Sequence, residues 1–187
     1  QFFDCAIHPS WSLSMLLNGG APRPENFDGL RRFRRDRPRG TANWDFLKKL
    51  RDVWKGKLIV KGVLDPGDAK KIKSFGADAV YVSGHGARQL DSLPPPIIQL
   101  PKIRQALGND YPIIFDTGIR NGEDIVKAYA LGANFVMIGR PVLYAIGADG
   151  ERGLRTIISY MVKEILVTMA QIGVTSISEI NEKVILR

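Results

Sequence analysis

Two glycine–arginine pairs near the ends of short apolar segments provide the chemistry of a phosphate-binding site. Gly118 and Arg120 follow one apolar segment, and Gly139 and Arg140 follow the next one along the chain. A glycine lets backbone N–H groups approach an anion, and a helix that begins there adds a favourable dipole. Each guanidinium can donate two parallel hydrogen bonds to a phosphate. The alternative is that both arginines pair with acidic side chains at the surface.

A histidine in a Gly-His-Gly turn supplies a second kind of chemistry. His85 can reach a ligand from such a turn, and a histidine there can act as a general base near neutral pH. Arg88, three residues later, could bind a substrate carboxylate through two parallel hydrogen bonds. Asp91 could orient a neighbouring side chain. The alternative for each of these residues is a loop position with local hydrogen bonds only.

A lysine and an aspartate follow two further apolar segments. Lys61 could stabilise negative charge on a cofactor ring. The alternative for Lys61 is a structural salt bridge with Asp116 or another acid. Asp116 itself could bind a ribityl-type hydroxyl or hold an arginine in place.

The elements that position these residues follow from an alternation of short apolar segments and amphipathic segments. The candidate strands are apolar on both faces, which is typical of a parallel sheet covered on both sides. They begin near residues 58, 79, 112 and 135, and the candidate helices cover 44–54, 66–75, 97–107, 121–131 and 151–171. The candidate residues therefore follow strand ends, where parallel α/β proteins gather their functional groups.

An open doubly wound sheet and a (β/α)8 barrel both fit this order of elements. Four strand–helix units make only half of such a barrel, which typically needs about 250 residues. Half a barrel alone exposes two sheet edges and its inner face, so we expect another half to cover them. Residues 1–42 lack a clear period and are expected to form an irregular segment with a loop, and residues 43–187 the half barrel.

The net charge of +8 is concentrated in an arginine run at residues 31–39. The run consists of Arg31, Arg32, Arg34, Arg35, Arg37 and Arg39. It could hold anionic lipid or nucleic acid electrostatically, and the alternative is a solvated loop. No aromatic stacking platform accompanies it, which disfavours nucleic acid.

Cysteine content and hydropathy indicate the compartment. A single cysteine excludes an internal disulfide framework and indicates a reducing compartment, so we expect a cytoplasmic protein. No apolar run approaches the roughly 18–20 residues of a membrane-spanning helix. The arginine run is then the candidate contact with the inner face of the cell membrane. We expect no metal site.

The segment 83–91, Ser-Gly-His-Gly-Ala-Arg-Gln-Leu-Asp, closely resembles the signature of the FMN-dependent 2-hydroxy-acid oxidases and dehydrogenases. Three further segments match that family in order and at its spacing, namely 61–63, 116–122 and 139–141. The resemblance extends from about residue 5 to residue 180, with the end segments closest to the L-lactate dehydrogenase branch. One position departs from the signature, which usually has Asn where this chain has Gly84.

The resemblance implies a (β/α)8 barrel that uses FMN to oxidise an L-2-hydroxy acid, in the first place L-lactate to pyruvate. His85 resembles the base that takes the substrate's proton, Arg88 the residue that binds its carboxylate, and Lys61 the cation beside flavin N1 and O2. The other matched residues resemble FMN ligands, with Ser83 at the flavin and Asp116, Gly118, Arg120, Gly139 and Arg140 at the ribityl phosphate. An NAD site is not expected, because no strand–GxGxxG–helix unit is present.

The resemblance also bears on partners. The family's first four strands have no counterpart in this chain, so the amino-terminal half barrel is an expected partner. Family members commonly form homotetramers, and residues from about 18 to 43 match a variable active-site loop that meets the membrane in some bacterial members. The alternative function is a truncated half barrel without activity that binds phosphate or a partner chain.

Overall fold

The computed structural model describes residues 7–17 and 42–185, and the chain divides into two compact units, 1–46 and 47–187. The arginine run lies outside the described residues. In the first unit, α2 (Pro9–Leu17) begins with proline, whose fixed backbone angle suits a first helical turn. The backbone carbonyl of His8 accepts the N–H of Ser12 at 3.0 Å and so starts the helix.

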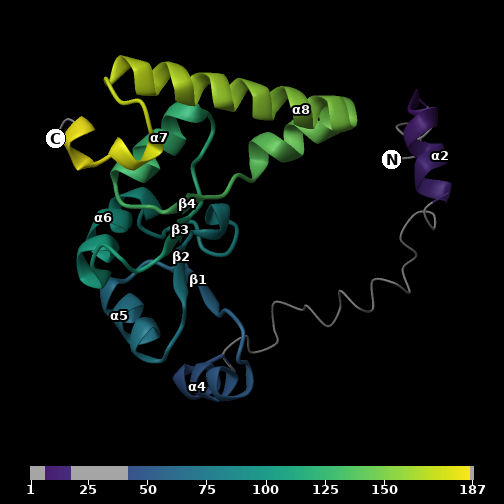
Figure 1. Cartoon of the computed structure of the whole chain (residues 1–187). Helices are drawn as coiled ribbons and strands as arrows, with labels where there is room; N and C mark the ends of the chain where they lie inside the picture. Colours follow the sequence, from purple (N-terminus) through teal and green to yellow (C-terminus); the bar gives the residue numbers. More distant parts are fainter. Residues whose placement is uncertain (1–6, 18–41, 186–187) are drawn as a thin grey trace. The chain divides into compact units, whose positions relative to one another are not determined.

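The second unit contains a four-stranded parallel sheet with helices between its strands (Figure 1). The strands are β1 (Ile59–Val63), β2 (Ala79–Val82), β3 (Ile113–Phe115) and β4 (Phe135–Val136). The helices are α4 (Trp44–Val53), which spans the boundary between the units, α5 (Pro66–Ser74), α6 (Pro96–Leu107), α7 (Gly122–Ala130) and α8 (Arg140–Gln171). The strands are ordered β1-β2-β3-β4, as in a barrel, whereas a doubly wound sheet reverses its order at a switch point. The expected half barrel is confirmed.

One face of the sheet is buried, and side chains of α5 and α6 belong to the same core. Val80, Val82, Ile113 and Phe115 are fully buried on this face. The opposite face carries a row of register partners across the four strands: Lys61, Tyr81, Ile114 and Phe135. Phe135 is 55% exposed there, although it is a large apolar side chain. This is the uncovered inner face that half a barrel leaves.

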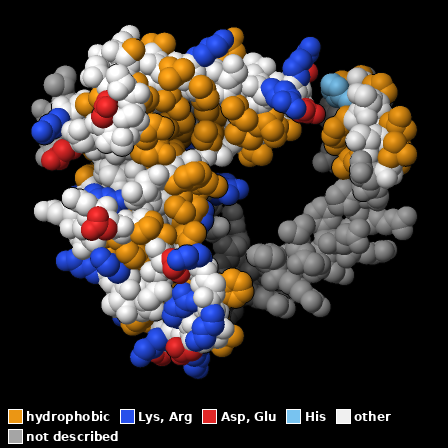
Figure 2. Space-filling view, viewed as in Figure 1, with side chains coloured by type: hydrophobic (Ala, Val, Ile, Leu, Met, Phe, Trp, Pro, Cys, Tyr) orange, Lys and Arg blue, Asp and Glu red, His pale blue; other side chains and the backbone are white. Residues whose placement is uncertain are grey.

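Exposed apolar side chains also follow α8. Figure 2 shows hydrophobic side chains gathered along this helix and on the surface beneath it, and Leu143, Tyr144, Ile158 and Leu166 are exposed on α8. Among the described residues, no helix is long and apolar enough to cross a membrane.

The last helix is longer than the sequence predicts. A helix was expected over 151–171, whereas α8 begins at Arg140 and is interrupted by non-helical backbone at Asp149 and Gly150. Pro141 in the first turn is the sequence signal for the earlier start. The part before the break therefore forms an extra helical segment directly after β4, where barrel enzymes often bind phosphate.

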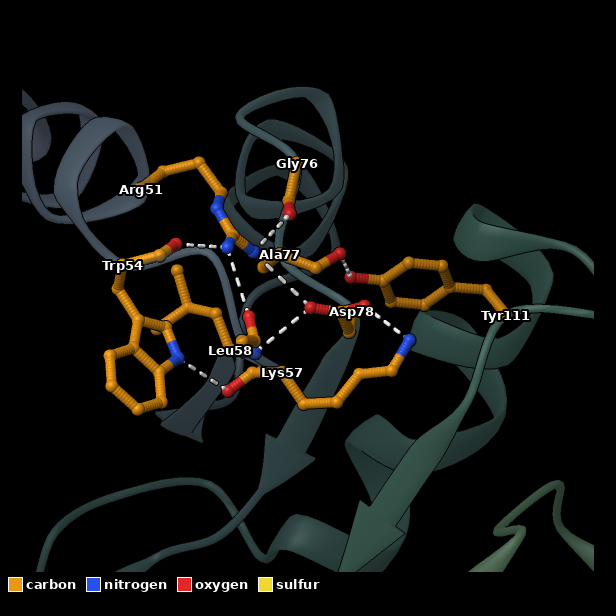
Figure 3. A network of polar contacts seen from close by, with 9 residues as sticks. Arg51, Trp54, Lys57, Leu58, Gly76, Ala77, Asp78 and Tyr111 are labelled. Carbon is orange, nitrogen blue, oxygen red and sulfur yellow. Dashed lines mark hydrogen bonds and ion pairs between the residues drawn. The ribbon is translucent and has the colours of Figure 1, made fainter.

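A polar network at the amino-terminal end of the strands joins α4 to the sheet (Figure 3). The carboxylate of Asp78 accepts hydrogen bonds from Arg51 at 3.3 Å, from Lys57 at 2.9 Å and from the backbone N–H of Leu58 at 2.9 Å. The guanidinium of Arg51 also donates to the carbonyl of Trp54. This network lies at the opposite strand ends from the candidate residues, so it contributes to stability rather than to chemistry.

Candidate active site

The carboxyl ends of all four strands open onto one cavity of about 260 Å³. Its lining includes eight of the nine predicted site residues: Lys61, His85, Arg88, Asp116, Gly118, Arg120, Gly139 and Arg140. The ninth, Ser83, is 1% exposed and lies in contact with this group through Lys61. The strand order explains the convergence, because the carboxyl ends of neighbouring parallel strands lie at one edge of the sheet. Asp91 is not part of the lining.

A larger hollow of about 1040 Å³ lies among α6, α7 and the carboxyl-terminal residues. Its one arginine, Arg104, is occupied by backbone carbonyls, including those of Gly108, Tyr111 and Gly132. None of the predicted site residues lines it. The chemistry therefore gathers in the smaller cavity.

The part of the cavity that is predicted to bind phosphate combines open backbone with two guanidinium groups. A Cβ atom built on Gly118 or on Gly139 would meet nothing within 4 Å, and Gly118 has a φ of +95°. The side chain of Arg120 donates only to the carbonyl of Ile119, at 3.2 Å. Within the described ranges, neither Arg120 nor Arg140 pairs with an acid, so the surface ion pairs considered for them are not found there. The first turn of α8 has no side-chain cap, which leaves its amino terminus able to receive an anion.

The ammonium of Lys61 is held on three sides. It donates to Ser83 Oγ at 2.6 Å, lies 3.1 Å from Asp116 Oδ2, and lies 4.3 Å from the centroid of the Tyr81 ring. The salt bridge to Asp116, considered as the alternative to a cofactor role, is therefore present. The side chain is nevertheless 40% exposed and lines the cavity, so this ion pair fixes the position of a cation that still faces a ligand.

Asp116 is the centre of a hydrogen-bond network. Its Oδ1 accepts from Thr117 Oγ1 at 2.8 Å, and its Oδ2 accepts from the Tyr81 hydroxyl at 2.8 Å. Burial acts to raise the pKa of Asp116, but hydrogen bonds from Ser83, Thr117, Tyr81 and Lys61 outweigh burial and hold the pKa below its ordinary value. Burial and the hydrogen bond to the carboxylate raise the pKa of Tyr81. Asp116 is thus ionised and holds Lys61, and it does not hold an arginine.

His85 lies in a tight turn of unusual backbone conformation. His85, Gly86 and Ala87 have positive φ angles of 54°, 66° and 64°. The imidazole packs against Gly62, because a Cβ atom there would lie 2.7 Å from His85 Cε1. In the part of the chain that the structure describes, the imidazole has no hydrogen-bond partner. Its ring nitrogens are therefore available to a ligand or to a residue of a completing half barrel.

Arg88 is placed to bind a carboxylate. Its Nε donates to the carbonyl of His85 at 3.2 Å, which ties the guanidinium to the histidine turn. Across the described residues, its two terminal nitrogens have no partner. Arg88 lines the cavity beside His85, so a small ligand can contact both side chains.

Sequence reasoning missed several residues that shape this cavity. Tyr81 and Thr117 bind Asp116, Gly62 receives the histidine ring, and Met137 and Leu143 line the wall. Tyr81 had a signal, since it is a polar position within a buried apolar strand and pairs in register with Lys61. Thr117 lies in the matched segment 116–122, but its hydrogen bonds to Gly84 and Gly86 join positions more than 30 residues apart, so the sequence did not indicate that role.

The fold and the site define the class first: a half barrel whose strand ends gather an imidazole, an ammonium, three guanidinium groups and open glycine backbone in one cavity. All of the chain, residues 1–187, matches the family model for FMN-dependent dehydrogenase. An L-lactate dehydrogenase from Pseudomonas syringae pv. syringae (strain B728a) is 39% identical over 200 residues, which cover 100% of this chain and 52% of that protein. This chain belongs to the FMN-dependent dehydrogenase family, a family of oxidoreductases.

Solved structures give the same class. The monotopic membrane protein (S)-mandelate dehydrogenase matches with a TM-score of 0.83 and 37% identity, over 97% of this chain and 50% of that chain. A soluble mutant of the membrane-associated (S)-mandelate dehydrogenase from Pseudomonas putida matches with a TM-score of 0.72 and 40% identity, over 76% of this chain and 40% of that chain. The chain thus spans about half the length of the relatives it matches.

FMN, the cofactor of this family, fits the residues of the cavity. Open glycine backbone, an uncapped helix start and two guanidinium groups that have no acid partner among the described residues suit its phosphate. The cation of Lys61 suits an electron-rich ring edge. These features belong to the same cavity, so one ligand can contact all of them.

Proposed function

We propose that this protein oxidises an L-2-hydroxy acid with FMN, and that L-lactate is the substrate, giving pyruvate. The observation that carries the proposal is the single cavity lined by an imidazole, a guanidinium with free terminal nitrogens and the FMN-binding set. The L-lactate dehydrogenase relative, which matches the whole of this chain, supports L-lactate as that acid.

Each side chain has a separate task in this proposal. Arg88 binds the substrate carboxylate through its two terminal nitrogens and so fixes the substrate beside His85. His85 accepts the proton of the 2-hydroxyl group as the bond between carbon 2 and its hydrogen breaks. When bound, FMN would supply the acceptor for the hydrogen of carbon 2 together with the two electrons of the broken bond.

Lys61 and Asp116 support that chemistry through charge. Lys61 keeps a positive charge at the cavity wall, where negative charge accumulates as the substrate is oxidised. Asp116 orients Lys61 through the 3.1 Å ion pair and remains ionised, because its pKa is held low. Ser83 donates toward the same carboxylate and accepts from Lys61, so it keeps the cation in one rotamer.

The proposed enzyme needs a complete barrel. The four-stranded sheet and the row on its inner face, where Lys61 and Phe135 are exposed and Tyr81 and Ile114 half-buried, match a half barrel that four further strands complete. We place those strands on an amino-terminal half barrel and assign residues 1–42 to the irregular segment with the active-site loop and residues 43–187 to the half barrel. Assembly into a homotetramer, as the family resemblance implies, stays a prediction.

Anaerobic addition of substrate to the FMN-loaded protein tests the function. L-lactate is expected to bleach the visible flavin band faster than L-mandelate or glycolate at equal concentrations. Faster bleaching by either of the other acids would reassign the substrate. A protein that binds inorganic phosphate but takes up no FMN would support the alternative, a half barrel without activity.

We further propose that residues 1–42 contact an anionic membrane surface through the arginine run. The membrane form of (S)-mandelate dehydrogenase matches 97% of this chain, whereas the soluble mutant matches 76%. In α2, which lies in the same segment, no residue is charged. Replacing the six arginines with glutamine is expected to release the protein from vesicles that contain phosphatidylserine. Equal binding of the native protein and the glutamine variant to those vesicles would contradict this contact.

A further inference from the structure

Thr117 connects the loop after β3 to the turn that carries His85. Its Oγ1 accepts the backbone N–H of Gly84 at 3.1 Å and that of Gly86 at 3.4 Å. The same hydroxyl donates to Asp116 Oδ1 at 2.8 Å. The N–H of His85 between them is accepted by Ser83 Oγ at 3.1 Å. Two side-chain hydroxyls therefore satisfy three successive N–H groups of the turn.

The backbone of Thr117 is held in a conformation that β-branched residues rarely adopt. Its φ is +82°, in the region that favours glycine. Such a conformation persists only where the surroundings stabilise it, and here the surroundings are the hydrogen bonds to Asp116, Gly84 and Gly86. The arrangement therefore places the hydroxyl of Thr117 across from the histidine turn at the expense of local strain.

A side chain at Gly84 would lie against Pro96 and in ordinary contact with the methyl group of Thr117. The φ of Gly84, −95°, suits any residue, so conformation does not require a glycine there. A Cβ atom at Gly84 would lie 3.6 Å from Thr117 Cγ2 and 3.0 Å from Pro96 Cγ. This is the position at which the chain departs from the family signature. The departure and the threonine therefore face each other in the structure.

We propose that Thr117 is the positioning residue for His85, and that Gly84 and Thr117 form a coupled pair through the hydrogen bond from the N–H of Gly84 to the hydroxyl. The hydroxyl fixes the turn, the turn aims the imidazole, and Asp116 fixes the hydroxyl. This proposal rests on the proposed function, in which His85 is the base.

Thr117→Val removes the hydroxyl at nearly constant shape, and Thr117→Ser keeps it. In the FMN-loaded protein, the valine variant is expected to show faster hydrogen exchange at the amides of Gly84 and Gly86. Its kcat for L-lactate should fall about 10- to 100-fold with unchanged FMN content, because small displacements of a base are costly. Serine should restore both slow exchange and most of the turnover.

A matched control is Thr156→Val on α8, whose exposed hydroxyl donates to the carbonyl of Arg152 at 2.8 Å. It is expected to change neither the exchange at the turn nor kcat. Unchanged exchange in Thr117→Val, or a serine variant as impaired as the valine one, would overturn the role of Thr117. If His85→Gln keeps its turnover, the proposed function fails, while the exchange data still decide whether Thr117 holds the turn.

A double-mutant cycle tests the coupling. Gly84→Ala is expected to speed amide exchange and lower kcat in the native background, and to do so less in a Thr117→Gly background. The contact with Pro96 is the same in both backgrounds, so it cancels in the comparison. Additive effects of the two substitutions would refute the coupled pair.

Discussion

Gly62 provides a sharp test of how the site is built, because its missing side chain is what admits the histidine ring. In Gly62→Ala, the new Cβ atom would lie 2.7 Å from His85 Cε1. Two carbon atoms in contact prefer about 3.7 Å, so the ring must move by about 1 Å. A displacement of this size costs about 100-fold in rate. We therefore expect kcat to fall about 100-fold while FMN stays bound.

The substitution also strains the backbone, and a second glycine separates the two effects. Gly62 has a φ of +92°, so an alanine there costs roughly 1–2 kcal/mol of stability. Gly108 has a φ of +80°, and a Cβ atom there would meet nothing within 4 Å. Gly108→Ala should therefore lower the urea midpoint of unfolding about as much as Gly62→Ala does, and it should leave kcat unchanged.

The assay measures kcat by anaerobic flavin reduction with L-lactate, and stability by urea unfolding, for both alanine variants and the native protein. Equal kcat in the two variants would refute the packing of His85 against Gly62. Loss of FMN from Gly62→Ala would show that the glycine acts on the cofactor site instead of on the histidine.

Three further substitutions test other parts of the account. His85→Gln cannot accept a proton, so turnover should fall at least about 100-fold with FMN still bound, and near-native turnover in a rapid-mixing assay would reject the base. Arg88→Lys should raise the KM for L-lactate by about 10- to 100-fold, because one ammonium does not replace a two-pronged contact, and an unchanged KM in steady-state assays would count against this role. The pKa of Asp78 lies below its ordinary value of 3.8, chiefly because its carboxylate accepts a hydrogen bond from Lys57. The ionised carboxylate therefore stabilises the folded protein fully above pH 3.8, and this stabilisation is lost as the pH falls through the lowered pKa. Asp78→Asn should therefore unfold at lower urea than the native protein at pH 7, and the difference should shrink below about pH 4; a difference that is independent of pH would contradict the ion pairing.

The sequence predicts the sheet and most of the site because both depend on local patterns. Short apolar segments followed by glycine and a polar residue indicate strand ends, and strand ends in parallel order must converge. Lys61, His85 and Arg140 were therefore expected at one place, and the structure confirms that they line one cavity. The part of α8 before Asp149 was missed because the apolar spacing of the helix is interrupted at Asp149 and Gly150.

The remaining features depend on contacts between distant segments. Tyr81 and Thr117 matter because β2 and β3 are neighbours, which brings Tyr81 to Asp116 and brings Thr117 to Gly84 and Gly86. The fit of the His85 ring against Gly62 depends likewise on the pairing of β1 with β2. Asp91 belongs to the same motif as His85, but it comes after the turn that carries His85. It therefore does not line the cavity, although it is close to His85 in the sequence.

The measurement that tests the central claim most directly is a comparison of FMN with riboflavin, each titrated into the purified protein and followed by flavin fluorescence. The phosphate group, which riboflavin lacks, is the proposed ligand of Gly118, Arg120, Gly139 and Arg140. Charge-assisted hydrogen bonds contribute about 1.5–3 kcal/mol each, so FMN should bind about 100-fold more tightly, and inorganic phosphate should weaken its binding. Equal affinities for the two flavins would contradict the assignment of these strand ends as the FMN phosphate site.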